Sequence, residues 1–499
     1  MTAGEKKKLI RLTDGNIRNA HIPVAGLRGF LPADCFGSPK KAGGVGKTIR
    51  ICLDGLERTI ETDIGRDAKT GKPRRQFRAR GWVKRFFQCH KAKAGDLLEL
   101  ERLGDREYHL RMADPGARTA EGVRPLIRVA EFFAGIGLVR LAFDPHKFKV
   151  IFANDIDPDK LEIYKDNFSI DEFRLGDIHL LRQEDIPDCD LVTASFPCTD
   201  LSIAGEMNGI HTGESSAFWG LVKLLREMSH RRPPLVLLEN VPGFLMSHEG
   251  KDFEAALTSL TELGYACDTF FMDAARFVPQ SRLRLFVVGK LGEVGQMPFG
   301  IAPTQLRPKS LIDFILAHPG IRWDLRQLPD PPERTGAMES ILEDLPDDHS
   351  AWWSEERANY LVSQFSERHA AVAKKMIDGP CYSYGTAFRR VRKGRSMAEL
   401  RTDGVAGCLR TPRGGSGRQI LFKGGKGRYQ VRLLTARECA RLQGVPDSYQ
   451  IQVPLNQALF GFGDAVCVPV IEWIVEHYFV PYFSEAPSRL ATEAEQRGL

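Results

Sequence analysis

Two short apolar segments, each followed by a chemically useful side chain, constrain this chain more than any other feature. Residues 190–194 read Asp-Leu-Val-Thr-Ala, a pattern typical of the end of a buried strand, and Pro197-Cys198 follows. Residues 235–238 are also apolar and end in Glu239-Asn240-Val241. Open α/β sheets place their chemistry in loops at the carboxyl ends of parallel strands. The pattern therefore predicts a thiol and a carboxylate over one pocket, with a buried cysteine and a capping glutamate as the alternative for either residue alone.

The composition indicates a globular protein with more than one domain. At 499 residues the chain is too long for one ordinary core, so two or three domains are expected. The absence of an 18-residue apolar run and of an apolar signal-peptide core predicts a cytoplasmic protein without a membrane partner. Ten cysteines without a C-x-x-C pair give no reason to expect a zinc site or a redox motif, and no metal is predicted.

The charge is distributed unevenly along the chain. Residues 1–120 contain 26 Lys and Arg against 14 Asp and Glu, whereas the remainder contains 44 against 50. A basic module joined to a mildly acidic one predicts a polyanionic partner, most simply nucleic acid. A solvated basic face is the alternative.

Residues 1–120 show the pattern of a small β-rich domain. Segments 48–53, 58–64 and 97–101 alternate apolar with polar residues and are separated by Gly and Asp turns, which predicts short strands in a small barrel. Residues 66–93 contain eleven basic residues and one acid, with Trp82, Phe86 and Phe87 interleaved. The predicted DNA contacts along this basic edge are Arg74, Arg75, Arg78, Arg80 and Lys84. Residues 112–124 are polar and turn-rich, as in a linker.

An α/β pattern begins at residue 126. A predicted strand is followed by Ala134-Gly135-Ile136-Gly137 and a helical pattern, but no Lys-Ser/Thr follows as in a P-loop. The next strand ends in Asp155, which can accept hydrogen bonds from ribose hydroxyls, and a third unit carries Asp177, which can accept one from an adenine amine. Each acid alone can equally be a cap or turn residue. Together the three turns predict a site for an adenosyl cofactor.

Six motifs follow one another along the chain: Phe133-Ala-Gly-Ile-Gly, Pro197-Cys198, Glu239-Asn240-Val241, Gln280-Ser-Arg282-Leu-Arg284, residues 432–444 and Gly463-Asp-Ala-Val. In this order they resemble the motifs of the DNA (cytosine-5) methyltransferases. The resemblance covers roughly residues 126–290 and 430–480. Two departures are that position 464 is Asp where the family usually has Asn, and that the cysteine loop reads Ser-Phe-Pro-Cys-Thr where Gly-Pro-Pro-Cys-Gln is more common.

The resemblance implies a Rossmann-like α/β methyltransferase domain that binds S-adenosylmethionine and acts on cytosine in double-stranded DNA. It implies four catalytic residues: Cys198, Glu239, Arg282 and Arg284. The cofactor-binding residues that it implies are Phe133, Gly135, Ile136, Gly137, Asp155, Ile156, Asp177, Ile178, Pro197, Asp464 and Ala465. An RNA cytosine-5 methyltransferase and a non-catalytic DNA-binding protein are the alternatives.

The segment between the catalytic motifs corresponds to the family's target recognition region. Residues 389–428 contain twelve basic residues against two acids, which favours contacts to bases or phosphates over a merely flexible basic loop. The predicted DNA contacts here are Arg410, Arg413, Ser416, Arg418 and Gln419. The predicted divisions are an N-terminal domain (1–120), a first catalytic part (121–300), the recognition region (301–429), a second catalytic part (430–486) and a disordered tail (487–499).

The N-terminal residues carry a second resemblance. His21-Ile-Pro, Phe30-Leu-Pro-Ala-Asp, Glu61-Thr-Asp and Arg80-Gly-Trp-Val-Lys-Arg-Phe-Phe resemble the effector domain of EcoRII-like restriction enzymes and the plant B-three-type DNA-binding domains. This implies a DNA-binding pseudobarrel. The whole architecture implies a cytoplasmic, nucleoid-associated enzyme of restriction-modification or phage defence, with a cognate restriction enzyme or other defence proteins acting on the same DNA.

Overall fold

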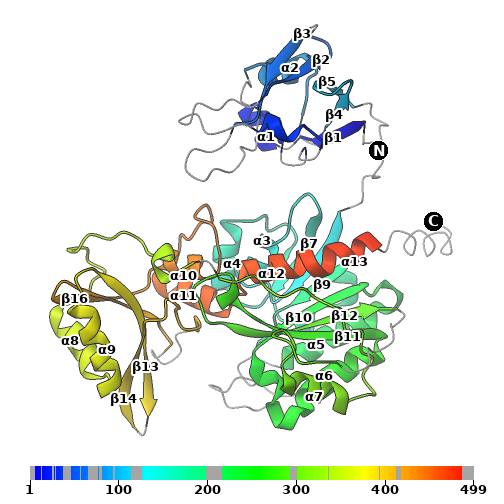
Figure 1. Ribbon diagram of the computed structural model, residues 1–499. Helices are drawn as coiled ribbons and strands as arrows, with labels where there is room; N and C mark the ends of the chain where they lie inside the picture. Colours follow the sequence, from blue (N-terminus) through cyan, green and yellow to red (C-terminus); the bar gives the residue numbers. More distant parts are fainter. Residues whose placement is uncertain are drawn as a thin grey trace. The chain divides into compact units, whose positions relative to one another are not determined.

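The computed structural model divides the chain into two compact units, residues 1–125 and 126–499 (Figure 1). It describes residues 6–12, 14–24, 27, 30–36, 47–56, 58–65, 77, 81–93, 96–113, 126–197, 216–292, 301–334, 336–392, 394–411 and 417–485. The predicted division at 120/121 lies close to the division between the units.

The N-terminal unit contains a five-stranded sheet in the order β1-β4-β5-β2-β3. β2 and β5 are parallel and the other neighbours are antiparallel. Closure into a barrel is not seen among the strand pairings of the described residues and stays a prediction. The elements are β1 (Lys7–Arg11), α1 (Asp14–Asn19), β2 (Ile49–Leu53), β3 (Arg58–Thr62), α2 (Val83–Cys89), β4 (Leu97–Arg102) and β5 (Glu107–Met112).

Helix α2 separates the aromatic from the basic residues of the 66–93 segment. Trp82, Phe86 and Phe87 are buried in the core of the unit, whereas Lys84 and Arg85 are exposed. The aromatic side chains are therefore core residues, because helical periodicity turns them inward. Of the predicted DNA contacts in this unit, Lys84 is exposed on α2, and Arg74, Arg75, Arg78 and Arg80 lie outside the described residues.

The catalytic part of the second unit is organised around a seven-stranded sheet in the order β11-β12-β10-β9-β6-β7-β8. β10, β9, β6, β7 and β8 run parallel, and β12 is antiparallel to both β10 and β11. This confirms the predicted α/β class. The strands are β6 (Ile127–Phe132), β7 (Phe148–Asp155), β8 (Phe173–Leu175), β9 (Leu191–Ala194), β10 (Leu235–Asn240), β11 (Tyr265–Asp273) and β12 (Leu283–Leu291).

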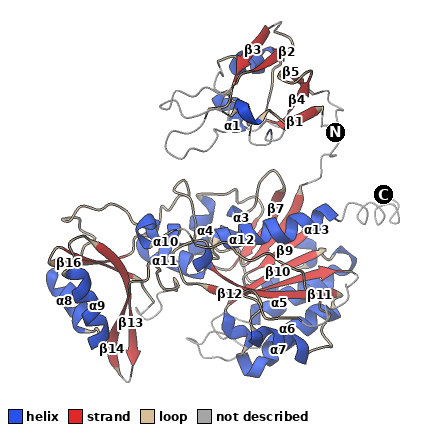
Figure 2. Ribbon diagram, in the orientation of Figure 1, coloured by secondary structure: helices blue, strands red, loops and turns tan. Residues whose placement is uncertain are grey.

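Helices cover both faces of this sheet (Figure 2). Alternate residues of the strands belong to two cores: Leu235 and Leu237 to one, Val236 and Leu238 to the other. Burial on both faces explains why these strands read as continuous apolar runs. The α-helices of the catalytic part are α3 (Leu138–Leu141), α4 (Pro158–Lys165), α5 (Ala217–Met228), α6 (Lys251–Glu262), α7 (Lys309–Ala317), α10 (Ala436–Leu442), α11 (Leu455–Asp464), α12 (Val468–Ile474) and α13 (Val480–Glu485).

A smaller module carries most of the predicted recognition region. A four-stranded antiparallel sheet in the order β14-β13-β15-β16 packs against helices α8 and α9 (Figure 1). Its core includes Leu361, Met376, Ala387 and Phe422. The elements are α8 (Glu355–Ser363), α9 (Glu367–Ile377), β13 (Ser383–Arg392), β14 (Arg395–Arg401), β15 (Ile420–Gly425) and β16 (Arg428–Leu433).

Both predicted boundaries of the recognition region differ from the structure. Residues 304–326 belong to the catalytic part, because α7 packs in its core and Arg307 forms a buried ion pair with Asp268 of β11, with 2.6 Å between Nη2 and Oδ1. The boundary at 429/430 falls inside β16. The recognition sheet therefore ends within the segment that sequence motifs assigned to the catalytic domain.

The C-terminal helices pack back on the catalytic sheet. Trp473, Ile474 and Phe479 are buried in the same core as β6 and β10. The described residues contain one helical stretch, Leu455–Ser484, that is long and apolar enough to cross a membrane, and 67% of its most apolar window is buried inside the protein. That burial is the property of a core helix. The predicted tail, 487–499, lies outside the described residues.

Candidate active site

The strand order of the catalytic sheet reverses between β6 and β9. From β6 the chain proceeds to β7 and β8 on one side, and β9 and β10 lie on the other. Ligands of open α/β sheets bind at the carboxyl ends of the strands next to such a switch point. The glycine turn, Asp155, Pro197 and Glu239 all lie at these ends, so the topology brings the predicted site residues to one edge of the sheet.

The glycine turn after β6 has a backbone conformation that few side chains tolerate. Phe133, Gly135 and Gly137 have φ angles of 56°, 57° and 80°. A Cβ on Gly137 would lie 2.5 Å from the Phe168 ring, whereas the nearest atom to a Cβ on Gly135 would be the Phe133 carbonyl oxygen at 4.0 Å. The Gly135 N–H donates to Asp155 Oδ2 at 2.8 Å. The turn is thus tied to the end of β7 and leaves room for a ligand at Gly135.

Asp155 is a buried carboxylate with accepting capacity to spare. Its Oδ1 accepts a hydrogen bond from the Asp157 N–H at 2.9 Å, and the residue is only 6% exposed. Burial raises its pKa, opposed by the charge of Lys160 and by the N–H groups of Asp157 and Gly135. Each carboxylate oxygen has two lone pairs, so ribose hydroxyls can still be bound. Ile156 beside it is 65% exposed, so an apolar side chain lies open next to this carboxylate.

Asp177 and Ile178 have different local roles. Asp177 caps a short 3-10 helix and accepts from the His179 N–H at 2.9 Å, which leaves its second oxygen for another donor. Ile178 is buried against Gly220, where a Cβ would lie 2.8 Å from Ile178 Cγ2. The cap that the sequence offered as an alternative for Asp177 is therefore present, and the adenine contact stays a prediction.

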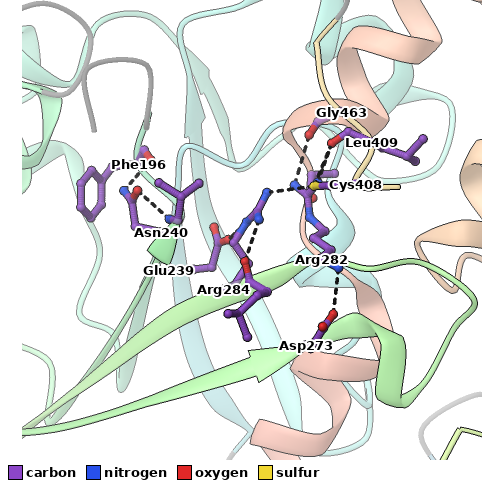
Figure 3. Close-up of polar contacts among 12 residues, drawn as sticks. Phe196, Glu239, Asn240, Asp273, Arg282, Arg284, Cys408, Leu409 and Gly463 are labelled. Atoms are coloured by element: carbon purple, nitrogen blue, oxygen red, sulfur yellow. Dashed lines mark hydrogen bonds and ion pairs between the residues drawn. The ribbon is translucent and has the colours of Figure 1, made fainter. Parts of the chain in front are cut away.

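The cysteine loop begins in a fixed position. Asn240 Nδ2 donates to the Phe196 carbonyl at 3.2 Å, and Asn240 Oδ1 accepts from the Val241 N–H at 2.8 Å (Figure 3). Pro197 follows Phe196, and Cys198 itself lies outside the described residues. The asparagine after Glu239 therefore links the end of β10 to the backbone that leads into the predicted nucleophile.

Glu239 and Arg284 form an ion pair at the end of β10. Arg284 Nε lies 2.9 Å from Glu239 Oε1, and the two side chains are 16% and 8% exposed. The arginine comes from β12, which pairs with β10 in antiparallel register. Two of the four predicted catalytic residues are thus brought together at the sheet edge near Pro197.

Arg282 has a different environment from the one predicted for a catalytic residue. Its guanidinium donates to the carbonyls of Leu409, Gly463 and Ala465 at 2.9, 3.1 and 2.7 Å (Figure 3). Its backbone N–H donates to Asp273 Oδ1 at 2.8 Å, and the residue is 2% exposed. Arg282 therefore joins the recognition segment and the last motif to β12, which is a structural role.

Cys408 is a site residue that sequence reasoning missed. Its Sγ lies 3.3 Å from Arg282 Nη1 and 3.9 Å from Arg284 Nη2. Burial opposes ionisation of this thiol, but the positive charges of Arg282, Arg284 and Arg410 prevail and lower its pKa. The sulfur thus lies between the structural arginine and the one paired with Glu239. No spacing in the sequence signalled this contact.

Lys160 explains the unusual aspartate of the last motif. Its Nζ lies 2.8 Å from Asp464 Oδ2. Burial lowers the pKa of Lys160, but Asp464 and Asp155 outweigh that effect and raise it overall. The neighbouring Ala465 uses its carbonyl to accept from Arg282. Asp464 is therefore matched by a lysine from α4, a partner that sequence reasoning did not identify.

The predicted recognition residues fall into three groups. Arg410 is exposed, and Arg418 donates to Asn456 Oδ1 at 2.8 Å. Gln419 is 7% exposed and its side-chain oxygen accepts from the Gly407 N–H at 3.1 Å, so the prediction that it reads a base is wrong for this conformation. Arg413 and Ser416 lie outside the described residues.

Comparison with known proteins places this geometry in a family. The sequence profile of the C-5 cytosine-specific DNA methylases matches residues 127–479. The chain is 29% identical over 352 residues to the type II methyltransferase M1.ScrFI of Lactococcus lactis subsp. cremoris, covering 70% of this chain and 77% of the relative. It is 27% identical over 348 residues to M.NgoBI of Neisseria gonorrhoeae, covering 70% and 91%.

A third relative is M.HhaI of Haemophilus parahaemolyticus, 25% identical over 349 residues and covering 70% of this chain and 93% of the relative. Among solved structures, the S. pombe Dnmt2 methyltransferase aligns with a TM-score of 0.47 at 21% identity, covering 70% of this chain and 97% of that one. The family match spans well over half of the chain. The protein therefore belongs to the C-5 cytosine-specific DNA methylase family, and it is an S-adenosylmethionine-dependent DNA cytosine methyltransferase.

Proposed function

We propose that this enzyme methylates C5 of a cytosine flipped out of a specific duplex sequence, with Cys198 as nucleophile and the Glu239–Arg284 pair as its electrostatic partner. The observation that carries the proposal is the 2.9 Å ion pair at the end of β10, next to the strand that leads into Pro197-Cys198. A carboxylate and a guanidinium at this place match the groups that an activated pyrimidine ring requires.

The chemistry begins with covalent catalysis. The Cys198 thiolate adds to C6 of cytosine, and the electron pair of the C5–C6 double bond moves through the ring toward N3 and O2, which makes C5 nucleophilic. Glu239 contacts N3 and donates to it when it carries a proton, and Arg284 stabilises the charge at O2. When bound, S-adenosylmethionine supplies the methyl group. Loss of the C5 proton then expels Cys198 from C6 and restores the ring.

The residues at the sheet edge fit the cofactor. The open space at Gly135, the spare lone pairs of Asp155 and the exposed face of Ile156 suit the aminoacyl chain, the ribose and the adenine respectively. Phe133, Ile136, Gly137, Asp177, Ile178, Pro197, Asp464 and Ala465 complete the proposed cofactor site. The acids place negative charge near a ligand whose sulfonium is positive.

A covalent trap tests the proposed nucleophile. A duplex that contains 5-fluorocytosine should form a stable complex with the wild-type enzyme in the presence of S-adenosylmethionine, because fluorine cannot leave as a proton does. Cys198→Ser should form none and should lose methyl transfer, since a hydroxyl is a far poorer nucleophile. Wild-type turnover by that variant would reject the chemistry.

Sequence choice is proposed to reside in the recognition region, through the exposed Arg410 and through Arg413, Ser416 and the half-buried Arg418. An arginine that binds guanine in a bidentate manner contributes about 1–3 kcal/mol of discrimination. Bisulfite sequencing of a plasmid that carries the gene would report the site and the modified base together. Relaxed methylation by Arg410→Ala would support base reading there.

The N-terminal unit is proposed to be a second DNA-binding domain of the EcoRII-like and B-three type. Its excess of basic residues and the exposed Lys84 and Arg85 support this assignment. Residues 1–125 form their own core, so they can be expressed alone. Binding to duplex DNA that weakens steeply with salt is the expected result. No binding at low salt would reject the assignment.

The biological setting is proposed to be bacterial restriction-modification or phage defence in the cytoplasm, at the nucleoid. The relatives are named type II methyltransferases, which supports the first of these. A cognate restriction enzyme is the partner that this setting implies. Resistance of a methylated plasmid to cleavage by a neighbouring nuclease would test it.

A further inference from the structure

Three arginines gather at one end of the recognition sheet. Arg357 lies on α8, Arg389 on β13, and Arg418 just before β15. The β13–β15 register pairs Ala387 with Ile420, so its continuation by two residues sets Arg389 opposite Arg418. Like charges directly opposite each other destabilise a sheet. These three residues are named here the arginine cluster.

The arginine cluster has no counter-ion within the described part of the chain. None of its guanidinium groups forms an ion pair there, although Arg418 donates a hydrogen bond to Asn456 Oδ1. The Nε atoms of Arg389 and Arg418 are buried without a hydrogen-bond partner among the described residues. Burial, followed by the charges of Arg389 and Arg418, lowers the pKa of Arg357. Arginine stays charged in proteins, so the repulsion cannot be relieved by loss of a proton.

Aromatic rings orient two of the three arginines, Arg357 and Arg389. The Arg357 guanidinium lies 3.9 Å from the centre of the Trp353 ring, and that of Arg389 lies 5.8 Å from the rings of both Trp353 and Tyr360. Tyr360 is 58% exposed. Cation–π contacts of this kind orient a guanidinium but leave its N–H groups available to a ligand.

Two other basic residues of the same sheet share an acidic partner. Lys423 and Arg428 both contact Asp347, at 2.7 and 3.0 Å. An acidic partner is therefore used elsewhere in this module, whereas the described residues provide none to the arginine cluster. A group of fixed, uncompensated guanidinium ions is the arrangement that binds phosphates.

We propose that the arginine cluster binds the sugar-phosphate backbone of the target duplex, beside the bases that the recognition region reads. The position supports this, because Arg418 is itself one of the predicted DNA contacts of the recognition region and Arg389 leads into the β13–β14 hairpin. This inference rests on the proposed function in one respect only, that the enzyme binds duplex DNA. It adds Arg357 and Arg389 to the DNA-contacting residues.

Salt-dependent binding of the full-length protein tests the assignment. The probes are a duplex that carries the methylated site mapped by bisulfite sequencing and a mixed-sequence duplex that lacks it. Arg357→Gln and Arg389→Gln should each reduce the slope of log affinity against log salt by about one, and should weaken binding to both duplexes by the same factor. Arg368→Gln is the matched control, because Arg368 is exposed on α9 of the same module and has no ion pair among the described residues.

Each outcome decides the proposal. An unchanged slope on both duplexes would overturn it, and weakening on the mapped duplex alone would assign base reading instead. Arg389→Lys keeps the charge and should retain the slope, which separates loss of a phosphate contact from misfolding. If the wild type methylated nothing but the variants still lost slope on mixed DNA, the proposed function would fail and the phosphate site would stand.

Discussion

The arginines of the catalytic sheet and those of the recognition sheet have different partners for their guanidinium groups. Arg284 is paired with Glu239, and Arg282 donates to three backbone carbonyls. Arg357 and Arg389 have aromatic rings beside them and no ion pair among the described residues. Arg282 is buried and Arg284 is nearly so, whereas Arg357 is exposed.

The difference shows what each region is prepared to bind. A buried cation requires a partner inside the protein, because desolvation is costly. Internal partners also fix its position, which suits a site that must align with the atoms of one pyrimidine ring. Cations without internal partners are suited to an external polyanion, where position matters less than charge. The predictions below test this contrast.

The largest effect is expected from Glu239→Gln. Loss of the carboxylate removes both the contact to N3 and the partner of Arg284, so single-turnover methyl transfer should slow by about 10²–10³-fold. Cofactor affinity measured by calorimetry should stay unchanged, because Asp155 and Asp177 are proposed to bind the adenosine. Glu262→Gln, on an exposed part of α6, is the control. Loss of cofactor affinity would show that the carboxylate has been assigned to the wrong ligand.

Arg282→Gln should cost stability where Arg357→Gln should not. Removal of the Arg282 guanidinium leaves the carbonyls of Leu409, Gly463 and Ala465 without this donor, a loss of about 2–4 kcal/mol. Arg357→Gln relieves repulsion and should change the free energy of unfolding by about 0.5 kcal/mol or less. Thermal unfolding of the two variants measures the difference. Equal losses would contradict the contrast between the two regions.

The sequence predicted the catalytic half of this molecule well, because its signals are local. The strands that end in Asp155 and Glu239 are apolar runs buried on both faces, and the glycine turn requires positive φ angles. Parallel topology alone then brings their ends together. The catalytic fold is thus determined by patterns that a single sequence displays.

The predictions that differed depend on contacts across long separations. Arg282 and Arg284 are two residues apart and have the same chemistry, yet only the fold decides which one meets Glu239 and which one meets Gly463. Gln419 has the groups of a base reader but is buried against Gly407. Cys408 and Lys160 gain their roles from partners far away in the chain, at Arg282 and Asp464.

The pair of Lys160 and Asp464 provides a smaller test at the cofactor site. Because burial raises the pKa of Asp155 and Lys160 opposes that shift, Lys160→Gln should raise the pKa of Asp155 further. Binding of S-adenosylmethionine to ribose hydroxyls requires the ionised acid, so affinity should fall as pH decreases, and in the variant it should fall at a higher pH. Calorimetry across the acid range checks this shift. Lys165→Gln, at the exposed end of α4, should leave the profile unchanged.

The smallest effect concerns Glu131, a buried acid without a hydrogen-bond partner in the described part of the chain. Unlike an arginine, it can lose its charge by binding a proton. Neither carboxylate oxygen of Glu131 has a hydrogen-bond partner among the described residues, and burial, opposed in part by Arg140, raises its pKa from 4.5 to about 8. The folded state therefore retains a proton that the unfolded state loses. The associated stability is fully present below pH 4.5 and is lost as pH rises through about 8.

Glu131→Gln should remove this dependence, since an amide remains neutral at every pH in the range. The variant should melt a few degrees higher than the wild type near pH 8 and should show little difference near pH 4.5. Glu162→Gln, on the exposed side of α4, is the control. A constant difference across the range would mean that Glu131 does not titrate there. A buried acid can shed its charge by binding a proton, whereas the arginine cluster must obtain its neutralising charge from another molecule.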